Sequence, residues 1–359
     1  MSSLERFLSF VRESVYDVFV VSQKEVVDFL RGHYALHDAF WFSKKEWRGV
    51  ANKMSYPTAV LDLPQRTLST KEELREWVLR QASCPIRIGF DPRVSYLEVE
   101  SWKSLFSGSS VCFEGDSTFC DTFRIQKTTD EMCKLRRAAD LACSGFNYAV
   151  RFLKPGITEE EIVAHMSTFW LQQQPSSRPS FDVMVLFGEN ASAPHNLPGK
   201  RRLRMGDVVL IDFGVKLDGF CSDLTRTFAF GEPADSEFLK VWKIVAKAKR
   251  EATALFKSRP SAETFEKVAR KIITDSGYGE YYVHSLGHGL GALVHELPRF
   301  HGEKPLPVDS CVTIEPGIYF PGRFGVRLED AFLVQDSGAL LLTDLPVYPY
   351  WEWYSKGVA

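Results

Sequence analysis

The dipeptide Asp218-Gly219, which lies between two runs of strand-forming residues, is the feature that most constrains how this chain can fold. Asp-Gly is a strong signal for a two-residue β-turn, and such a turn sets the register of the strands that it joins. In that register Asp212 lies opposite Thr225, and Asp223 is a diagonal neighbour of Asp212 on the same face, at roughly 7–8 Å. Two carboxylates that point together repel each other unless a cation or a shared proton compensates. The hairpin therefore predicts either a metal site or an exposed acidic face.

A second hairpin is predicted over 313–330, and each of its strands carries a glutamate. A three-residue loop at 321–323 would place Glu315 directly opposite Glu329. Facing glutamates destabilise a sheet in the absence of a cation. Both glutamates lie among apolar residues, where a solvated acidic patch is unfavourable. The pattern favours a cation-binding interpretation.

Four of the eight histidines lie within one short segment: His284, His288, His295 and His301. Glycines flank His288 on both sides, which disfavours a helix and predicts a loop or a bulged strand that another group approaches closely. A single histidine is most often a hydrogen-bonded packing residue, and this is the interpretation that we favour for His301.

The three segments together contribute four carboxylates and one imidazole, and such oxygen-rich ligation suits hard or borderline divalent ions such as Mn²⁺. Four carboxylates around one divalent ion would be overcharged, whereas two ions balance four negative charges, as in two-metal hydrolases. The sequence therefore predicts two divalent metal ions, with Mn²⁺ first and Co²⁺ or Zn²⁺ as alternatives. The predicted ligands are Asp212, Asp223, His288, Glu315 and Glu329.

Charge and cysteine usage narrow the choice of partners and compartment. The formal net charge is −2, from 44 lysines and arginines against 46 aspartates and glutamates, which gives no reason to expect binding to nucleic acid or to an anionic membrane. The seven cysteines are scattered without a C-x-x-C pair, which favours reduced thiols in a cytoplasmic protein. Glu5 and Arg6 interrupt any signal-peptide core, and no apolar window is long enough to span a membrane.

Two domains are predicted. The first, residues 1–123, alternates short strands with helices and carries no catalytic constellation. Periodicity is lost over 115–127, and a helix follows over 130–152, behind a capping box formed by Thr128 and Glu131. The second domain, residues 124–359, continues with strands over 180–230, helices over 236–256 and 261–276, and a strand-rich segment over 281–345.

Four strings in the second domain carry a resemblance to a known family: LIDFGVKLDGFCSDLTRTF, HSLGHGLGALVHELP, TIEPGIYFPGRFGVRLED and ENASAPHNLP. They resemble the signatures of the pita-bread dinuclear metallopeptidases, which include methionine aminopeptidases, Xaa-Pro aminopeptidases, prolidases and creatinase. The resemblance covers about residues 127–345. It implies an α+β fold with a C-terminal pita-bread catalytic domain. The smaller α/β domain in front resembles that of creatinase and the proline-specific members.

The resemblance also implies how the ligands are used. Asp212 and Asp223 would hold one metal ion, and Asp223 and Glu329 would bridge to the other. His288 and Glu315 would complete the second site. A water or hydroxide between the two ions would be the nucleophile, because a divalent ion lowers the pKa of bound water.

Further residues receive roles from the same resemblance. Glu315 would be the general base for the water, while Thr225 and Arg327 would orient the ligand carboxylates. The histidines that would contact the substrate and stabilise the tetrahedral intermediate are His195, His284 and His295. Arg299 would bind the free carboxylate of a dipeptide, or it is a surface arginine.

The resemblance implies a metal-dependent Xaa-Pro aminopeptidase, which cleaves the N-terminal bond of peptides with proline at the second position. An Xaa-Pro dipeptidase (prolidase) with the same mechanism is the alternative, because the two differ only in whether the pocket admits residues beyond proline. A metal-free hydrolase of the creatinase type and a catalytically inactive binding module are weaker alternatives, since all five ligands are present. The five aromatic residues within 348–354 predict packing over the catalytic domain, or a contact in a homodimer.

Overall fold

The computed structural model describes residues 3–31, 38–51 and 67–351. Contacts divide the chain into two compact units, Met1–Arg124 and Ile125–Ala359. All seven cysteines are free thiols, and four of them are buried. Within the described ranges, no helix combines the length and the apolarity needed to cross a bilayer.

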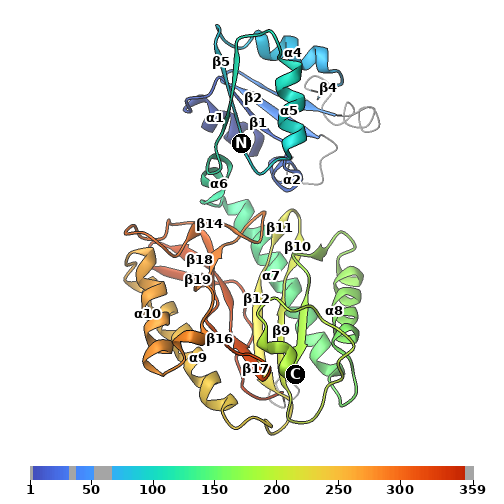
Figure 1. Cartoon of the computed structure of the whole chain (residues 1–359), viewed down its shortest axis with the longest axis vertical. Helices are drawn as coiled ribbons and strands as arrows, with labels where there is room; N and C mark the ends of the chain where they lie inside the picture. The colour runs from blue at the N-terminus through green and yellow to red at the C-terminus, as the bar shows by residue number, and fades with distance from the viewer. Residues whose placement is uncertain (1–2, 32–37, 52–66, 352–359) are drawn as a thin grey trace. The chain divides into compact units, whose positions relative to one another are not determined.

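The first unit is built on one mixed sheet, whose strands are, in spatial order, β4 (Thr67–Leu68), β3 (Trp47–Val50), β2 (Ala39–Ser43), β1 (Val18–Val21), β5 (Ile86–Phe90) and β6 (Val111–Gly115). Its helices are α1 (Ser3–Arg12), α2 (Lys24–Arg31), α4 (Lys71–Leu79), α5 (Tyr96–Leu105) and α6 (Phe119–Arg124) (Figure 1). The central strand β1 is buried along its whole length. Trp77 of α4 and Trp102 of α5 pack into the core that β1 and β5 help to form.

One half of the second unit contains helices α7 (Thr129–Ala149) and α8 (Glu159–Gln173), with the 3₁₀ turns η1 (Val150–Phe152) and η2 (Gly188–Ser192). Its strands form two small sheets. One sheet has the order β12 (Leu224–Ala229), β9 (Val208–Phe213), β8 (Met184–Phe187), and the other has the order β11 (Phe220–Cys221), β10 (Val215–Leu217), β7 (Arg178–Pro179). Phe146 of α7 stacks on Phe213 of β9 with ring centroids 5.4 Å apart, inside the core of this half.

The other half contains helices α9 (Phe238–Ala254) and α10 (Ala262–Asp275), with the 3₁₀ turns η3 (Leu255–Lys257) and η4 (Gly279–Tyr281). Its larger sheet has the order β14 (Glu296–Arg299), β13 (His288–Gly289), β15 (Cys311–Ile314), β18 (Asp330–Gln335), β19 (Gly338–Leu341). The hairpin of β16 (Gly317–Phe320) and β17 (Phe324–Arg327) completes this half. In Figure 1, α8 covers one side of the strands of the unit and α9 and α10 cover the other.

The helix predicted over 130–152 is present as α7 followed by η1. It begins with the predicted capping box: Glu131 N donates to Thr128 Oγ1 at 3.3 Å, and Thr128 N donates to the Glu131 carboxylate at 2.8 Å. The two reciprocal bonds satisfy donors that the first turn of a helix leaves unpaired.

The first hairpin has the predicted register. Its two turn residues have φ angles of 51° and 84°, as a type I′ turn requires, and Asp212 lies opposite Thr225. The ladder is interrupted at Gly214, since β9 pairs with β12 whereas β10 pairs with β11. A Cβ on Gly214 would lie 1.9 Å from the backbone oxygen of Ser222, so the strands approach too closely there for a side chain.

The second hairpin also has the predicted register. Phe320 pairs with Phe324 across the loop 321–323, and β15 and β18 continue in the same register further along the strands. The ladder is again interrupted between its two parts, at the position where the register sets Glu315 opposite Glu329. The interruptions therefore lie at Asp223, Glu315 and Glu329, whereas Asp212 lies in the regular ladder two residues before Gly214.

The two hairpins meet along β12. Glu329 N donates to Thr225 O at 3.1 Å, and the Thr227 hydroxyl donates to Arg327 O at 2.8 Å. These long-range bonds bring the face that carries Asp212 next to the face that carries Glu329. The two halves of the unit thus share one polar boundary between their separate hydrophobic cores.

The aromatic run near the C-terminal end packs onto the second unit in its described part. Trp351 lies 4.9 Å from Phe230 between ring centroids, and its indole N–H donates to Val150 O at 3.1 Å. The remaining residues of the run, 352–354, lie outside the described residues. A homodimer contact stays a prediction.

Candidate metal centre

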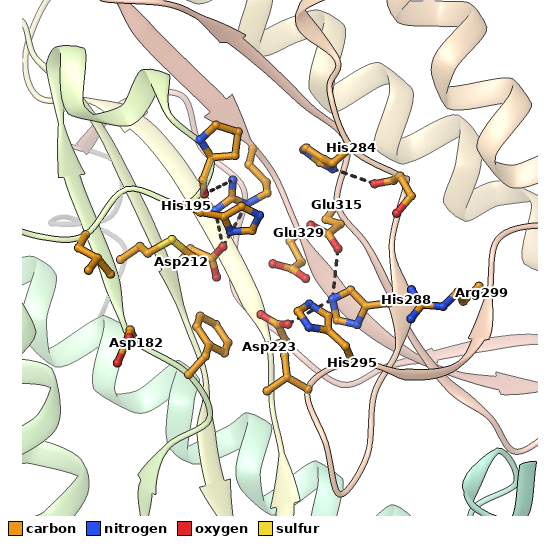
Figure 2. A pocket seen from close by; sticks show the side chains of 17 residues that line it. Asp182, His195, Asp212, Asp223, His284, His288, His295, Arg299, Glu315 and Glu329 are labelled. Atoms are coloured by element: carbon orange, nitrogen blue, oxygen red, sulfur yellow. Dashed lines mark hydrogen bonds and ion pairs between the residues drawn. The ribbon is translucent and has the colours of Figure 1, made fainter. Parts of the chain in front are cut away.

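A cavity of about 640 Å³ lies between the two halves of the second unit, which is within the usual size range of small-ligand sites. Figure 2 shows that four of the labelled carboxylates point toward a common centre in it: Asp212, Asp223, Glu315 and Glu329. The predicted site residues that line this cavity are Asp212, Asp223, His288, Glu315, Glu329, Arg327, His195, His284, His295 and Arg299. Thr225 lies fully buried behind them.

His288 lies on β13, where the strand carries a β-bulge between this residue and Gly289, as the flanking glycines predict. A Cβ on Gly289 would lie 2.3 Å from the backbone of Leu297, which explains why a glycine is required there. His288 Nδ1 is 3.1 Å from Gly289 O. Because a carbonyl only accepts, Nδ1 carries the proton and the lone pair of Nε2 faces the cavity.

The electrostatic surroundings of His288 favour a metal ligand. Its Nε2 lies 3.3 Å from Glu315 Oε1 and 3.6 Å from Asp223 Oδ2. Burial lowers the pKa of His288 to about 3, so the imidazole is neutral. Ligand atoms of Asp223, His288 and Glu329 lie within 4.8 Å of one another. A neutral imidazole beside several carboxylates is a donor set that divalent ions bind.

The carboxyl groups are perturbed in the opposite direction. Burial, followed by the neighbouring carboxylates, raises the pKa values of Asp223 and Glu329 well above their ordinary range. Burial also raises the pKa of Glu315 to about 8. Like charges that share a buried site hold protons where too little positive charge surrounds them, and a divalent cation would supply the missing charge.

Two of these carboxylates present one anchored oxygen and one bare oxygen. Glu329 Oε2 accepts from the Thr225 hydroxyl at 2.7 Å, and Asp212 Oδ2 accepts from Arg327. Asp212 Oδ1 and Glu329 Oε1 are buried with no hydrogen-bond partner among the described residues. A buried oxygen without a donor is costly, so the two atoms fit ligation of a cation.

Arg327 is the buried cation of the site. Its Nε lies 3.1 Å from both Asp212 Oδ2 and Thr225 Oγ1, its Nη2 also contacts Asp212, and its Nη1 donates to the Tyr319 hydroxyl at 2.6 Å. The two residues predicted to orient carboxylates thus both contact them. The single guanidinium leaves most of the negative charge of the four carboxylates uncompensated.

Tyr319 is a residue that the sequence reasoning missed. Its hydroxyl accepts from Arg327 and lies 2.9 Å from His284 Nε2, while His284 Nδ1 lies 2.8 Å from Ser285 O. The carbonyl makes Nδ1 the donor, so Nε2 accepts from the tyrosine. The alternation of the strand could have identified Tyr319, because residues 315, 317 and 319 share one face.

The predicted substrate residues lie around the metal-ligand candidates. His295 is exposed, and its ring lies 4.3 Å from that of His288 between centroids. Arg299, also exposed, is at the end of β14 and pairs with His288 across the sheet. His195 is exposed on the segment after η2. In Figure 2, His195 lies beside Asp212, whereas Arg299 lies beyond His288.

This fold and this donor set define the class of the protein, a metallopeptidase. The model of a family described as metallopeptidase family M24 matches residues 133–336, more than half of the chain. The chain belongs to metallopeptidase family M24. Uncharacterized peptidases of Staphylococcus aureus are 41% identical to it over 251 residues, which cover 69% of this chain and 71% of theirs.

Solved structures extend the similarity to nearly the whole chain. An Xaa-Pro dipeptidase from Bacillus anthracis is 28% identical with a TM-score of 0.86, covering 97% of this chain and 98% of its own. A prolidase from Pyrococcus horikoshii is 26% identical with a TM-score of 0.87, covering 97% and 99%. An X-Pro aminopeptidase from Thermotoga maritima is 27% identical with a TM-score of 0.85, covering 98% and 99%. The predicted family and the predicted pita-bread fold with a preceding α/β domain are confirmed.

Proposed function

We propose that this metallopeptidase is an Xaa-Pro aminopeptidase, which hydrolyses the bond between an N-terminal residue and a following proline, with two divalent ions, Mn²⁺ first, in a cytoplasmic setting. The observation that carries the proposal is the pair of bare buried oxygens, Asp212 Oδ1 and Glu329 Oε1, beside the neutral imidazole of His288 in a peptide-sized cavity. The similar structures are a prolidase, an Xaa-Pro dipeptidase and an X-Pro aminopeptidase, and these activities support the substrate class.

The residues that would hold the ions are Asp212, Asp223, His288, Glu315 and Glu329. When bound, the ions supply a water of lowered pKa as the nucleophile. Glu315 would take the proton of the attacking water, because its carboxylate lines the cavity next to His288 and a carboxylate within reach of the water can act as a general base. Thr225 and Arg327 keep the carboxylates of Glu329 and Asp212 in place through the hydrogen bonds described above.

The exposed histidines act on the substrate. His195 and His295 stand on the cavity wall, where their ring N–H groups can donate to the carbonyl oxygen of the bond that is cleaved. His284 has both ring nitrogens engaged, with Tyr319 and Ser285 O. We therefore propose that His284 contributes as a rigid part of the cavity wall, because both of its ring nitrogens are already hydrogen-bonded to the protein.

A second candidate, an Xaa-Pro dipeptidase, is favoured by one observation: the exposed guanidinium of Arg299 lines the same cavity. A guanidinium binds a carboxylate through two parallel hydrogen bonds, and a dipeptide places its C-terminal carboxylate close to the scissile bond. If Arg299 makes this contact, dipeptides are preferred over longer peptides.

Peptide length tests the two candidates. Purified protein reconstituted with Mn²⁺ is assayed on an Xaa-Pro dipeptide, its C-terminal amide and an Xaa-Pro-Xaa tripeptide. Cleavage of the tripeptide and amide at rates similar to the dipeptide supports the aminopeptidase. Cleavage of the dipeptide alone would overturn it. Arg299→Gln should then raise KM for the dipeptide, whereas Arg250→Gln, at an exposed position on α9, should not.

Metal analysis tests the mechanism and the remaining alternatives. The proposal expects two divalent ions per chain after reconstitution, and a large loss of kcat in Glu315→Gln. Absence of bound metal together with full activity of Glu315→Gln would favour the metal-free creatinase type. Absence of any peptidase activity in the metal-loaded protein would favour the binding module.

A further inference from the structure

Glu159, the first residue of α8, is completely buried and accepts four hydrogen bonds. Its Oε1 accepts from Phe187 N at 2.7 Å and from Asn190 Nδ2 at 3.0 Å. Its Oε2 accepts from Gly199 N at 2.9 Å and again from Asn190 Nδ2 at 3.0 Å. Glu161, two residues further along, instead caps the helix at the exposed side, so two carboxylates in the first turn of α8 have different tasks.

All the donors to Glu159 lie on one segment, and they lie at its two ends. Phe187 ends β8 and Asn190 lies in η2, whereas Gly199 closes the segment. Between these ends stands His195, on the cavity wall beside Asp212 in Figure 2. The segment 187–199 is therefore a loop whose base is closed by one buried carboxylate. We call it the His195 loop.

The helix backbone strengthens the same closure. Glu160 N donates to Gly199 O at 3.2 Å, and Glu159 N donates to Arg201 O at 3.3 Å. The centre of the loop is held separately from the other side, where Arg327 Nη1 donates to Pro194 O at 3.4 Å. The base of the His195 loop is thus held by α8, whereas its centre is held by Arg327.

We propose that Glu159 is a positioning residue of the peptidase, which acts by closing the base of the His195 loop and so placing His195 over the cavity. The catalytic role of His195 rests on the proposed function, whereas the closure of the loop by Glu159 does not. Glu159 does not line the cavity, so it acts through the loop and not on the substrate.

The chemistry of the contact explains why a carboxylate is needed. A buried carboxylate accepts on both oxygens, and hydrogen bonds to a charged acceptor are the stronger kind. Glutamine has the same size but only one acceptor oxygen. Whichever way its amide turns, the NH₂ group faces an N–H donor at one end of the loop. Glu159→Gln therefore releases one end of the loop while the fold around it keeps its shape.

A double-mutant cycle tests the role in catalysis. Glu159→Gln should lower kcat/KM for an Xaa-Pro peptide by between about tenfold and a hundredfold, because a small misplacement of a catalytic group has effects of this size. In a His195→Ala background, Glu159→Gln should lower kcat/KM by less than about twofold, because the effects of substitutions at coupled residues do not add. Glu161→Gln is the matched control and should act equally in both backgrounds. Additive effects of Glu159→Gln would overturn the proposal.

Amide hydrogen exchange tests the loop without any enzymatic readout. Glu159→Gln should speed exchange in the segment 187–199, whereas Glu161→Gln should leave that segment unchanged. If Glu159→Gln does not fold, Asn190→Ala replaces it, because it removes two of the four hydrogen bonds and should produce the same pattern. Exchange in this segment at the wild-type rate in the folded variant would overturn the proposal. An inactive wild-type protein with faster loop exchange in the variant would overturn only the proposed function.

Discussion

The metal-free protein should lose stability as the pH rises through neutrality, and the contribution of Glu315 to this loss can be worked out from its pKa. Burial raises the pKa of its carboxyl from an ordinary 4.5 to about 8 in the folded state. Between these two values the folded state holds a proton that the unfolded state has released. The stability that this group contributes is therefore present at low pH and is lost as the pH rises through the folded pKa.

The magnitude follows from the two pKa values. Between pH 6 and pH 8 the unfolded carboxyl is ionised throughout, whereas the folded carboxyl passes from protonated to half ionised, which costs about 2 kcal/mol. The histidines act in the opposite direction. Burial lowers the pKa of His284 to about 4, so this group destabilises the fold only below neutrality. Comparison with a variant that lacks the Glu315 carboxyl cancels the contribution of the histidines to the pH dependence of stability.

The assay is urea unfolding of wild type and Glu315→Gln at pH 6 and pH 8, with a chelator present, followed by circular dichroism. The wild-type free energy of unfolding should fall between the two pH values by about 2 kcal/mol more than that of the variant. Saturating Mn²⁺ should abolish the extra loss, since a bound cation favours the ionised form at every pH. Equal pH dependence in the two metal-free proteins would refute the reasoning.

Three further predictions concern contacts around the site. Thr225→Val should weaken Mn²⁺ binding by about 10- to 100-fold in a calorimetric titration, because the hydroxyl 2.7 Å from Glu329 is lost; an unchanged affinity would exclude this role. Lys127→Met should destabilise the fold by about 3–5 kcal/mol in urea, because the buried Glu296 loses an ammonium 2.7 Å away; a cost near zero would contradict the pairing. Gly214→Ala should lower the melting temperature, through about 1–3 kcal/mol of overpacking against the facing strand, and a wild-type value would exclude the close approach.

Turn chemistry and strand alternation were sufficient to predict those parts of the site that lie within one hairpin. The turn at 218–219 and the loop at 321–323 set two registers, and a period of two then placed Asp212 opposite Thr225 and Glu315 opposite Glu329. The glycines around His288 likewise predicted the bulged strand that the structure contains. These properties depend on residues that are neighbours along the chain or across one ladder.

Tyr319 marks the limit of such reasoning. Its position on the face of Glu315 was available from the alternation, but its partners were not. The contact with Arg327 requires the hairpin, and the contact with His284 requires a segment 35 residues away. Tyr319 is one of 12 tyrosines in the chain, and only the packing of the strands identifies it as a residue of the site.

The sequence by itself determined the two strand registers, the ligand types and the family resemblance. Only the tertiary structure decided that Arg327 balances Asp212, 115 residues away, and that Glu159 closes the loop of His195. It also decided the shifted pKa values, because these follow from burial between two packed halves. The physical reason is that register is a short-range property of paired strands, whereas the burial and pairing of charges depend on which distant segments the two hydrophobic cores bring together.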